Sequence, residues 1–275
     1  MSLSLWRILA VLGCLLPLHL FAAPFPLLAD GSWLSSNKIE AVVLDVRSRA
    51  EFMHGHWPRA RWAGFRELDW QVERYGLPGY LPREKELAAL LGGLGLDGSE
   101  SVVVIGSARH PRQIAEAARV VWSLMMAGFQ QVALLDGGIE SLSPRDLVKD
   151  ASLVEPKECS IKLRHDLLAD SYRVQGLLDN NKPVIDFRPT LYFDGFERDP
   201  QVPEGGTIYD GVGIPPKLFL DASSGRFLSA KIIQQEFDRY GIATKGAMAA
   251  FSDTGVWAAL GWFILHRVLQ LSLIH

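Results

Sequence analysis

The chain has few cysteines, and this scarcity limits its covalent chemistry. Cys14 and Cys159 are the only two in 275 residues, and Cys14 lies in an N-terminal apolar stretch. A chain that loses this stretch keeps Cys159 alone and can form no intramolecular disulfide, even in an oxidising compartment. Glu155 and Glu158 stand beside Cys159 and disfavour a thiolate there. We therefore interpret Cys159 as a partly buried small apolar residue and not as a reactive thiol.

The chain also lacks an excess of positive charge. It carries 28 Lys and Arg against 31 Asp and Glu, a formal net charge of -3. A nucleic-acid-binding protein needs a basic surface to neutralise phosphates, so we exclude that class. With 48% hydrophobic and 21% charged residues, the composition is that of a globular protein, and the length allows two hydrophobic cores.

No apolar run reaches the length of about 20 residues that a membrane-spanning helix needs. Residues 8–21 are largely apolar, but a proline and a histidine interrupt them. This pattern is typical of a secretory signal, and we expect cleavage after Ala22, which removes residues 1–22 and places the protein in the periplasm or outside the cell. The alternatives are an uncleaved membrane anchor and a lipid-modified Cys14.

Apolar runs of four to six residues alternate with helical stretches in two copies of one plan. The first copy has strands near 41–47, 101–106 and 131–136 and a helix near 111–127, and the second has strands near 183–188 and 246–251 and a helix near 257–268. Such alternation predicts an α/β fold with two domains, each a parallel sheet flanked by helices on both faces. We place the domains at 30–145 and 171–275, with a linker at 146–170.

A glycine-bearing turn joins the last apolar strand to the last apolar helix, and Ser252 stands at its first position. Such a turn aims successive backbone N–H groups inward at the positive end of a helix, so it favours an anion. A cysteine in this place would be an activated thiolate. The candidate binding residues of the turn are Asp253, Thr254, Gly255, Val256 and Trp257.

Seven short motifs, in order and in two copies, carry a resemblance. They are Asp45-Val-Arg47, Glu51-Phe52, Gly55 to Ala60, Leu135 to Gly138, Asp186-Phe-Arg188, Phe193-Asp-Gly195 and Ser252 to Trp257. From about residue 33 to its end, the chain resembles the tandem-domain rhodanese family of thiosulfate and 3-mercaptopyruvate sulfurtransferases. The resemblance implies that the second domain carries the site, where a cysteine persulfide passes sulfane sulfur to cyanide or a thiol.

The chain departs from this family pattern at three side chains. Ser252 occupies the position of the family's cysteine, and a serine oxygen cannot carry a transferable sulfur atom. Trp257 stands where many members have an arginine, threonine or serine, and Tyr192 stands where substrate-binding members have an arginine. We therefore expect persulfide chemistry to be absent, while the loop still binds an anion or a partner.

Asp-x-Arg pairs end the first predicted strand of each copy. We interpret Asp45 with Arg47, and Asp186, as structural, because buried carboxylates at strand ends normally pair or bond to the loop backbone. Arg188 is the nearest cation that remains to steady an anion beside Ser252. The small-ligand candidates are sulfur-containing anions of the thiosulfate, sulfite or mercaptopyruvate class; the other candidate is a protein partner.

The first copy has Gly106 at the position that matches Ser252, so the resemblance implies an inactive domain. Arg109, His110 and Arg112 follow it and are interpreted as solvated loop residues that form, at most, a small basic mouth. His54 and His56 suggest a metal pair only by spacing, and the resemblance places His56 in a locally packed turn. We expect no metal and no cofactor.

Three function hypotheses follow. The one that we favour is an exported rhodanese-like binding protein without persulfide chemistry. The first alternative is an active sulfurtransferase whose cysteine was changed to serine, and the second is an enzyme with Ser252 as hydroxyl nucleophile, which needs a base such as His165 or His266. The second domain also looks short at its C-terminal end, because only residues 269–275 remain for a last strand.

Overall fold

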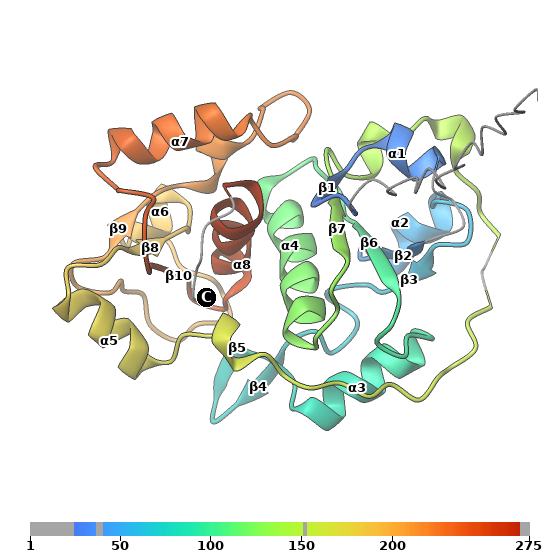
Figure 1. Ribbon diagram of the computed structural model, residues 1–275, viewed down its shortest axis with the longest axis horizontal. Coiled ribbons are helices and arrows are strands. Elements are labelled where there is room, and N and C mark those ends of the chain that lie inside the picture. Colours follow the sequence, from blue (N-terminus) through green and yellow to red (C-terminus); the bar gives the residue numbers. More distant parts are fainter. Residues whose placement is uncertain (1–24, 37–40, 151–152, 270–275) are drawn as a thin grey trace, which may run out of the picture.

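The computed structural model describes residues 25–36, 41–150 and 153–269. Two parallel sheets stand on either side of a central pair of helices (Figure 1). This arrangement confirms the predicted α/β fold with two units, each built on a parallel sheet. The expected signal segment at 1–22, with Cys14, and residues 270–275 lie outside the described residues.

The first unit has a five-stranded parallel sheet in the order β1-β7-β6-β2-β3. Its strands are β1 (Leu28–Ala29), β2 (Ala41–Asp45), β3 (Arg61–Trp62), β6 (Ser101–Ile105) and β7 (Val132–Leu135), and its helices are α1 (Gly31–Ser36), α2 (Arg49–His54), α3 (Glu84–Gly93) and α4 (Pro111–Met126). Val102 and Val104 join the core under α3 and α4, whereas Val103 and Ile105 join the core under α1 and α2. Successive side chains of β6 thus reach opposite faces, and both faces are buried.

The second unit has a three-stranded parallel sheet in the order β10-β8-β9. Its strands are β8 (Val184–Asp186), β9 (Val212–Gly213) and β10 (Ala249–Phe251), and its helices are α5 (Ser171–Asp179), α6 (Thr190–Phe193), α7 (Ala230–Arg239) and α8 (Val256–Trp262), which continues as a π-helix over Phe263–Val268. Helix α5 covers one face of this sheet, and α7 and α8 cover the other.

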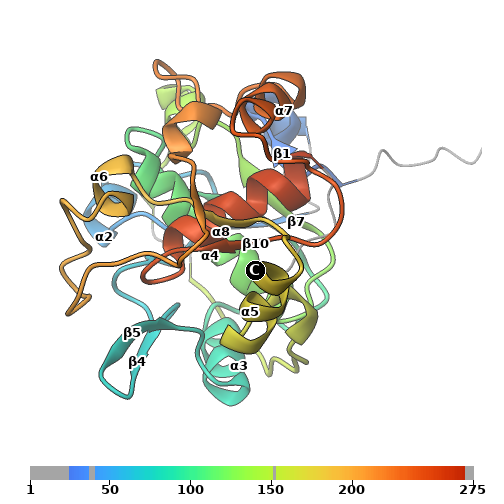
Figure 2. The ribbon, with the colours of Figure 1, turned by 90° about the vertical axis from the view of Figure 1, so that its left-hand side faces the viewer.

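Helices α4 and α8 lie side by side between the two sheets (Figures 1 and 2). Every residue of α4 from Ile114 to Met126 is buried, because the helix packs against its own sheet on one side and against α8 on the other. One apolar core therefore runs through both units, with Trp122 of α4 and Leu260 of α8 among its members. This shared core holds the relative position of the two units.

Shorter elements complete the fold. Single-turn helices cover Ile139–Ser141, Pro144–Asp146, His165–Leu167 and Pro216–Phe219, and an antiparallel hairpin is formed by β4 (Val72–Arg74) and β5 (Leu77–Tyr80). The segment that joins the units runs along the first one, since Lys157 N donates to Gly92 O and Arg164 N to Met126 O. Among the described helices, none combines the length and the apolar character that a membrane crossing requires.

Candidate functional site

The loop that begins at Ser252 follows β10 directly. Phe251, the last residue of β10, is in register with Asp186 of β8, so the loop starts at the C-terminal edge of the second sheet. Gly255 has a φ of 74°, a left-handed conformation that glycine adopts without strain, and α8 begins at the next residue. The predicted sequence of strand, glycine turn and helix is present.

The Ser252 hydroxyl is used by its own loop. Its Oγ accepts a hydrogen bond from the backbone N–H of Ala258, in the first turn of α8, at 3.1 Å. Within the described residues, neither His165 nor His266 is hydrogen-bonded to Ser252, and His266 instead stacks on Trp262 with ring centroids 5.0 Å apart. The side chain therefore caps a helix, and no base is positioned to activate it.

Arg188 is enclosed by two carboxylates. Its Nε and Nη2 donate to Asp186 at 2.6 to 3.0 Å, and its Nη1 pairs with Asp253. Nη2 also donates to Gly206 O at 2.6 Å, and the side chain is only 3% exposed. Burial raises the pKa of Asp253, and the charge of Arg188 opposes this rise. The guanidinium is therefore committed to the loop itself and not free to hold an anion beside Ser252.

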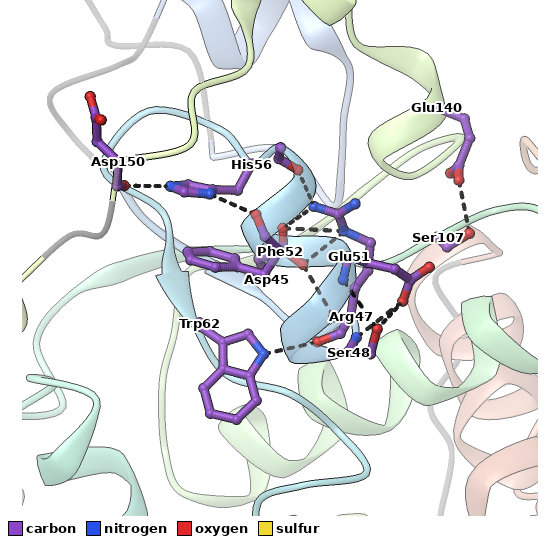
Figure 3. Close-up of polar contacts among 11 residues, drawn as sticks. Asp45, Arg47, Ser48, Glu51, Phe52, His56, Trp62, Ser107, Glu140 and Asp150 are labelled. Carbon is purple, nitrogen blue, oxygen red and sulfur yellow. Dashed lines mark hydrogen bonds and ion pairs between the residues drawn. The ribbon is translucent and has the colours of Figure 1, made fainter.

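The same Asp-x-Arg arrangement ends β2 in the first unit (Figure 3). Arg47 donates from Nε and Nη2 to Asp45, with Nη2 to Oδ2 at 2.6 Å, and also to Gly55 O at 2.7 Å. Asp45 is fully buried. In both units the arginine thus ties the loop after a strand to the strand's last residue, as expected of a structural pair.

A residue that the sequence analysis missed, Arg119, contacts the loop from the first unit. It lies in the middle of α4, is 2% exposed, and has no ion-pair partner among the described residues. A Cβ on Gly255 would lie 2.4 Å from its Nη1, so the loop approaches the guanidinium closely. Burial lowers the pKa of Arg119 to about 10. The signal in the sequence was an arginine flanked by Ala118 and Val120 in the apolar part of a helix.

Two of the residues after Gly106 that were interpreted as solvated loop residues, Arg109 and Arg112, are in ion pairs with acidic residues. Arg109 pairs with Glu140 at 3.0 Å. Arg112 pairs with Glu116 of its own helix at 3.4 Å and with Asp199 of the second unit at 3.0 Å. Its guanidinium also lies over the Trp257 ring, 5.7 Å from the centroid. Arg112 thus joins the two units and covers Trp257, a role that sequence reasoning did not find.

Tyr192 lies in α6 and lines a cavity of about 740 Å³ between the two units, together with Gly79, Arg112 and Asp199. Ser252 is not among the residues that line this cavity. The structure therefore brings together Ser252, Asp253 and Arg188, and it places Tyr192 in the neighbouring cleft instead of beside them.

The histidines and the cysteine have structural surroundings. His56 is buried, stacks on Phe52 at 3.8 Å, and has its ring nitrogens 2.9 Å from Phe52 O and Asp150 O (Figure 3), whereas His54 is exposed. Over residues 25–36, 41–150 and 153–269, no three His, Cys, Asp or Glu side chains form a group suited to a metal ion. Cys159 is half-buried, and burial, together with two nearby carboxylates, raises its thiol pKa.

Known proteins resemble the chain in sequence and in fold. The rhodanese-like domain family matches residues 31–144. The thiosulfate/3-mercaptopyruvate sulfurtransferase 1 of Arabidopsis thaliana mitochondria is 29% identical over 245 residues, which are 79% of this chain and 62% of that protein. A putative thiosulfate sulfurtransferase, SseB, of Mycobacterium tuberculosis is 26% identical over 79% of both chains.

Among solved structures, the 3-mercaptopyruvate sulfurtransferase SseA of Escherichia coli matches 90% of this chain and 96% of its own, with a TM-score of 0.73 and 19% identity. The anaerobic ergothioneine biosynthesis enzyme of Chlorobium limicola matches 90% of this chain and 65% of its own, with a TM-score of 0.77 and 18% identity. Residues 31–144 therefore match the rhodanese-like domain family, the chain as a whole has the rhodanese fold, and its sequence is similar to those of the named sulfurtransferases.

Proposed function

We propose that this protein is an exported rhodanese-like binding protein that lacks persulfide chemistry. The observation that carries the proposal is the state of Ser252. A persulfide forms when a thiolate attacks the outer sulfur of the donor, and the sulfur then passes to an acceptor. A serine hydroxyl, which here accepts a hydrogen bond from Ala258 N, performs neither step, because its oxygen cannot carry the transferred sulfur.

The electrostatics of the loop support a protein partner over a small sulfur anion. In the interpretation of the sequence, Arg188 was the cation that would steady an anion over Ser252. Arg188 already pairs with Asp186 and Asp253, and the carboxylate of Asp253 lies in the loop itself. Thiosulfate, sulfite and mercaptopyruvate would each face that carboxylate. We therefore propose that the loop binds a protein partner, and we treat binding of a small sulfur anion as the alternative hypothesis.

The purified protein tests this proposal directly. Incubation with thiosulfate and cyanide, or with 3-mercaptopyruvate and a thiol, is expected to give no thiocyanate or sulfide above a protein-free blank. Calorimetric titrations with thiosulfate, sulfite and sulfate are expected to show no binding at millimolar concentrations. A turnover that depends on protein concentration contradicts the loss of persulfide chemistry, and millimolar or tighter anion binding contradicts the choice of ligand.

The proposed export and signal cleavage can be tested separately from the binding function. The pattern of residues 8–22 is the support for it, and the mature protein is expected to start at Ala23. Amino-terminal sequencing of the protein from a periplasmic or secreted fraction checks this. Retention in the membrane fraction with the complete N-terminus, or a mass that fits a lipid on Cys14, contradicts cleavage after Ala22.

A further inference from the structure

The first unit holds a polar cavity at the C-terminal ends of β2 and β6. It measures about 250 Å³ and is lined by residues that follow these two strands, among them Arg47, Ser48 and Ser107. Figure 3 shows Arg47, Ser48 and Glu51 beside this point. The chain continues from β2 to β3 on one side of the sheet and from β6 to β7 on the other, so the strand order reverses between β2 and β6. Open α/β sheets bind ligands at such a switch point.

This cavity adjoins the larger cleft between the units. Arg66, Glu67 and Glu116 line both of them. The cleft, about 740 Å³, is bounded by the β4–β5 hairpin on one side and by the segment 192–201 of the second unit on the other. A narrow pocket thus opens into a wide, exposed cleft. At about 250 Å³ the pocket is smaller than the roughly 300–1,000 Å³ that enclose a whole ligand, and it suits one side chain.

The combined lining is strongly acidic. Six carboxylates line the pocket and the cleft, against the three guanidinium groups of Arg47, Arg66 and Arg112. The six are Glu51, Glu67, Asp69, Glu73, Glu116 and Asp199. All three arginines are in ion pairs, whereas four of the acids, Glu51, Glu67, Asp69 and Glu73, have none among the described residues. The excess of negative charge requires a cationic ligand.

The pocket also has more acceptors than donors. Gln113 Oε1 is buried and lacks a hydrogen-bond partner within the described part of the chain. Glu51 receives the Ser48 N–H and hydroxyl on Oε2, which leaves its other oxygen unused. Partial burial acts to raise the pKa of Glu51, but these hydrogen bonds and the charge of Arg47 keep it below its ordinary value, so the carboxylate is ionised. A ligand that fits must bring N–H donors.

The segments that bound the cleft carry exposed apolar side chains. Tyr75 and Leu77 of the hairpin are 89% and 47% exposed, and Phe196 in the facing segment is 80% exposed. Tyrosine and phenylalanine supply much contact area at a protein interface at small entropic cost. These three side chains do not line the cleft, but they are exposed on the segments that bound it, where a peptide can reach them and a small amine in the cleft cannot.

We propose that the cleft binds an extended peptide segment of a partner protein and that the pocket between β2 and β6 receives its arginine or lysine side chain. The donors of that side chain face Gln113 Oε1 and the carboxylates of Glu51, Glu67 and Glu116. The first unit, which has Gly106 at the position that matches Ser252, thereby becomes the recognition unit. This inference rests on the proposed function only in taking the protein as a partner-binding module.

The test is a binding measurement with defined peptide pools. Fluorescein-labelled pentapeptides, acetylated and amidated at their ends, carry arginine, lysine, glutamate or norleucine at the centre and random residues around it. Fluorescence anisotropy with the full-length protein is expected to show binding of the arginine and lysine pools only, and the affinity is expected to fall as salt rises. N-acetylarginine amide is expected to compete at least about tenfold more weakly than the arginine pool, because it lacks the contacts in the cleft.

Two variants locate the site. Glu67→Gln keeps an acceptor for the Arg49 N–H but removes a charge, and Gln113→Leu removes the unused acceptor. Each is expected to weaken binding of the arginine pool by about tenfold or more, whereas Glu158→Gln, at an exposed acid remote from the cleft, leaves it unchanged. Circular dichroism and the Tm check that the variants are folded. If one variant does not fold, the other still tests the site.

Several results overturn the proposal. They are no binding by any pool, equal binding of the norleucine or glutamate pool, and unchanged affinity in both folded variants. If N-acetylarginine amide competes at the same concentration as the peptides, the claim that the ligand is a peptide is wrong, and the site binds a small molecule instead. None of these results depends on sulfur transfer, so a failure here is separate from a thiocyanate signal, which would contradict the proposed function alone.

Discussion

Arg119 in the middle of α4 donates a hydrogen bond from Nη2 to the carbonyl oxygen of Gly79, 3.0 Å away. Gly79 in turn lies against the backbone of Thr254, since a Cβ on it would come within 2.5 Å of Thr254 O. Helix α4 of the first unit therefore contacts the hairpin, and the hairpin contacts the Ser252 loop of the second unit. This contact fixes the position of the loop from outside the second unit.

We expect Arg119→Met to raise the free energy of unfolding at pH 7 by about 1–2 kcal/mol. Burial lowers the pKa of Arg119 from its ordinary value to about 10, which corresponds to a destabilisation of about 3 kcal/mol by the buried charge. The hydrogen bond to Gly79 and the contact with Trp122, at 4.5 Å, offset about 1–2 kcal/mol of it. Urea denaturation measures the change.

The pH dependence gives the control for Arg119. A base with a lowered folded pKa destabilises the fold at every pH below that value, and the penalty fades as the pH rises from about 10 towards the ordinary pKa of an arginine. The advantage of the methionine variant should therefore be complete at pH 7 to 9 and shrink above pH 10. A loss of more than about 2 kcal/mol at pH 7 contradicts the account of Arg119 as an unpaired buried charge.

Arg188→Met is expected to have the opposite effect, with a loss of about 3–5 kcal/mol at pH 7, because it leaves two buried carboxylates without their cation. Burial raises the pKa of Asp253, and removal of Arg188 raises it further. A raised folded pKa of an acid favours the protonated form, so stability falls as the pH rises from 3.8 through the folded pKa. The loss relative to wild type should be smaller at pH 4 than at pH 7. An equal loss at both would assign the effect to packing alone.

The fold was predictable because its signals are local. Short windows of sequence suffice to recognise the apolar strands and helices, which are β2, β6, β7, α4 and α8. The repeated Asp-x-Arg pairs mark the strand ends. The predicted two-unit α/β fold is confirmed for this reason. The position of Ser252 at the end of β10 follows from the same local pattern.

The long-range contacts of the site were not predictable. The pairing of Arg188 with Asp253 joins residues 65 positions apart, and the pairing of Arg112 with Asp199 joins residues 87 apart and in different units. No periodicity in the sequence encodes such contacts: the first depends on the pairing of β8 with β10, and the second on how the two units pack together. The lack of an ion-pair partner for Arg119 among the described residues was likewise hidden, since its surroundings come from the hairpin and the Ser252 loop as well as from α4.

Gly79→Ala tests the contact between the hairpin and the Ser252 loop. A methyl group at this position meets the Thr254 backbone, and the φ of 88° adds backbone strain, so we expect a loss of about 2–4 kcal/mol. Gly76→Ala in the same hairpin is the matched control, because its φ of 74° gives similar strain and nothing lies within 4 Å of the added Cβ. It should lose only about 1 kcal/mol. Equal losses in urea denaturation contradict the contact.

Ser252→Cys separates a missing nucleophile from a changed site. We expect this variant to form no more thiocyanate from thiosulfate and cyanide than wild type, because Arg188 stays paired with Asp186 and Asp253 and so does not stabilise the new thiolate. The assay belongs in a Cys159→Ser background, so that the pH dependence of iodoacetamide alkylation reports on the new thiol alone. An alkylation midpoint near that of an ordinary thiol supports the absence of activation. Robust turnover would instead show that the backbone cradle suffices, that Tyr192 and Trp257 are tolerated, and that one atom separates this chain from the sulfurtransferases.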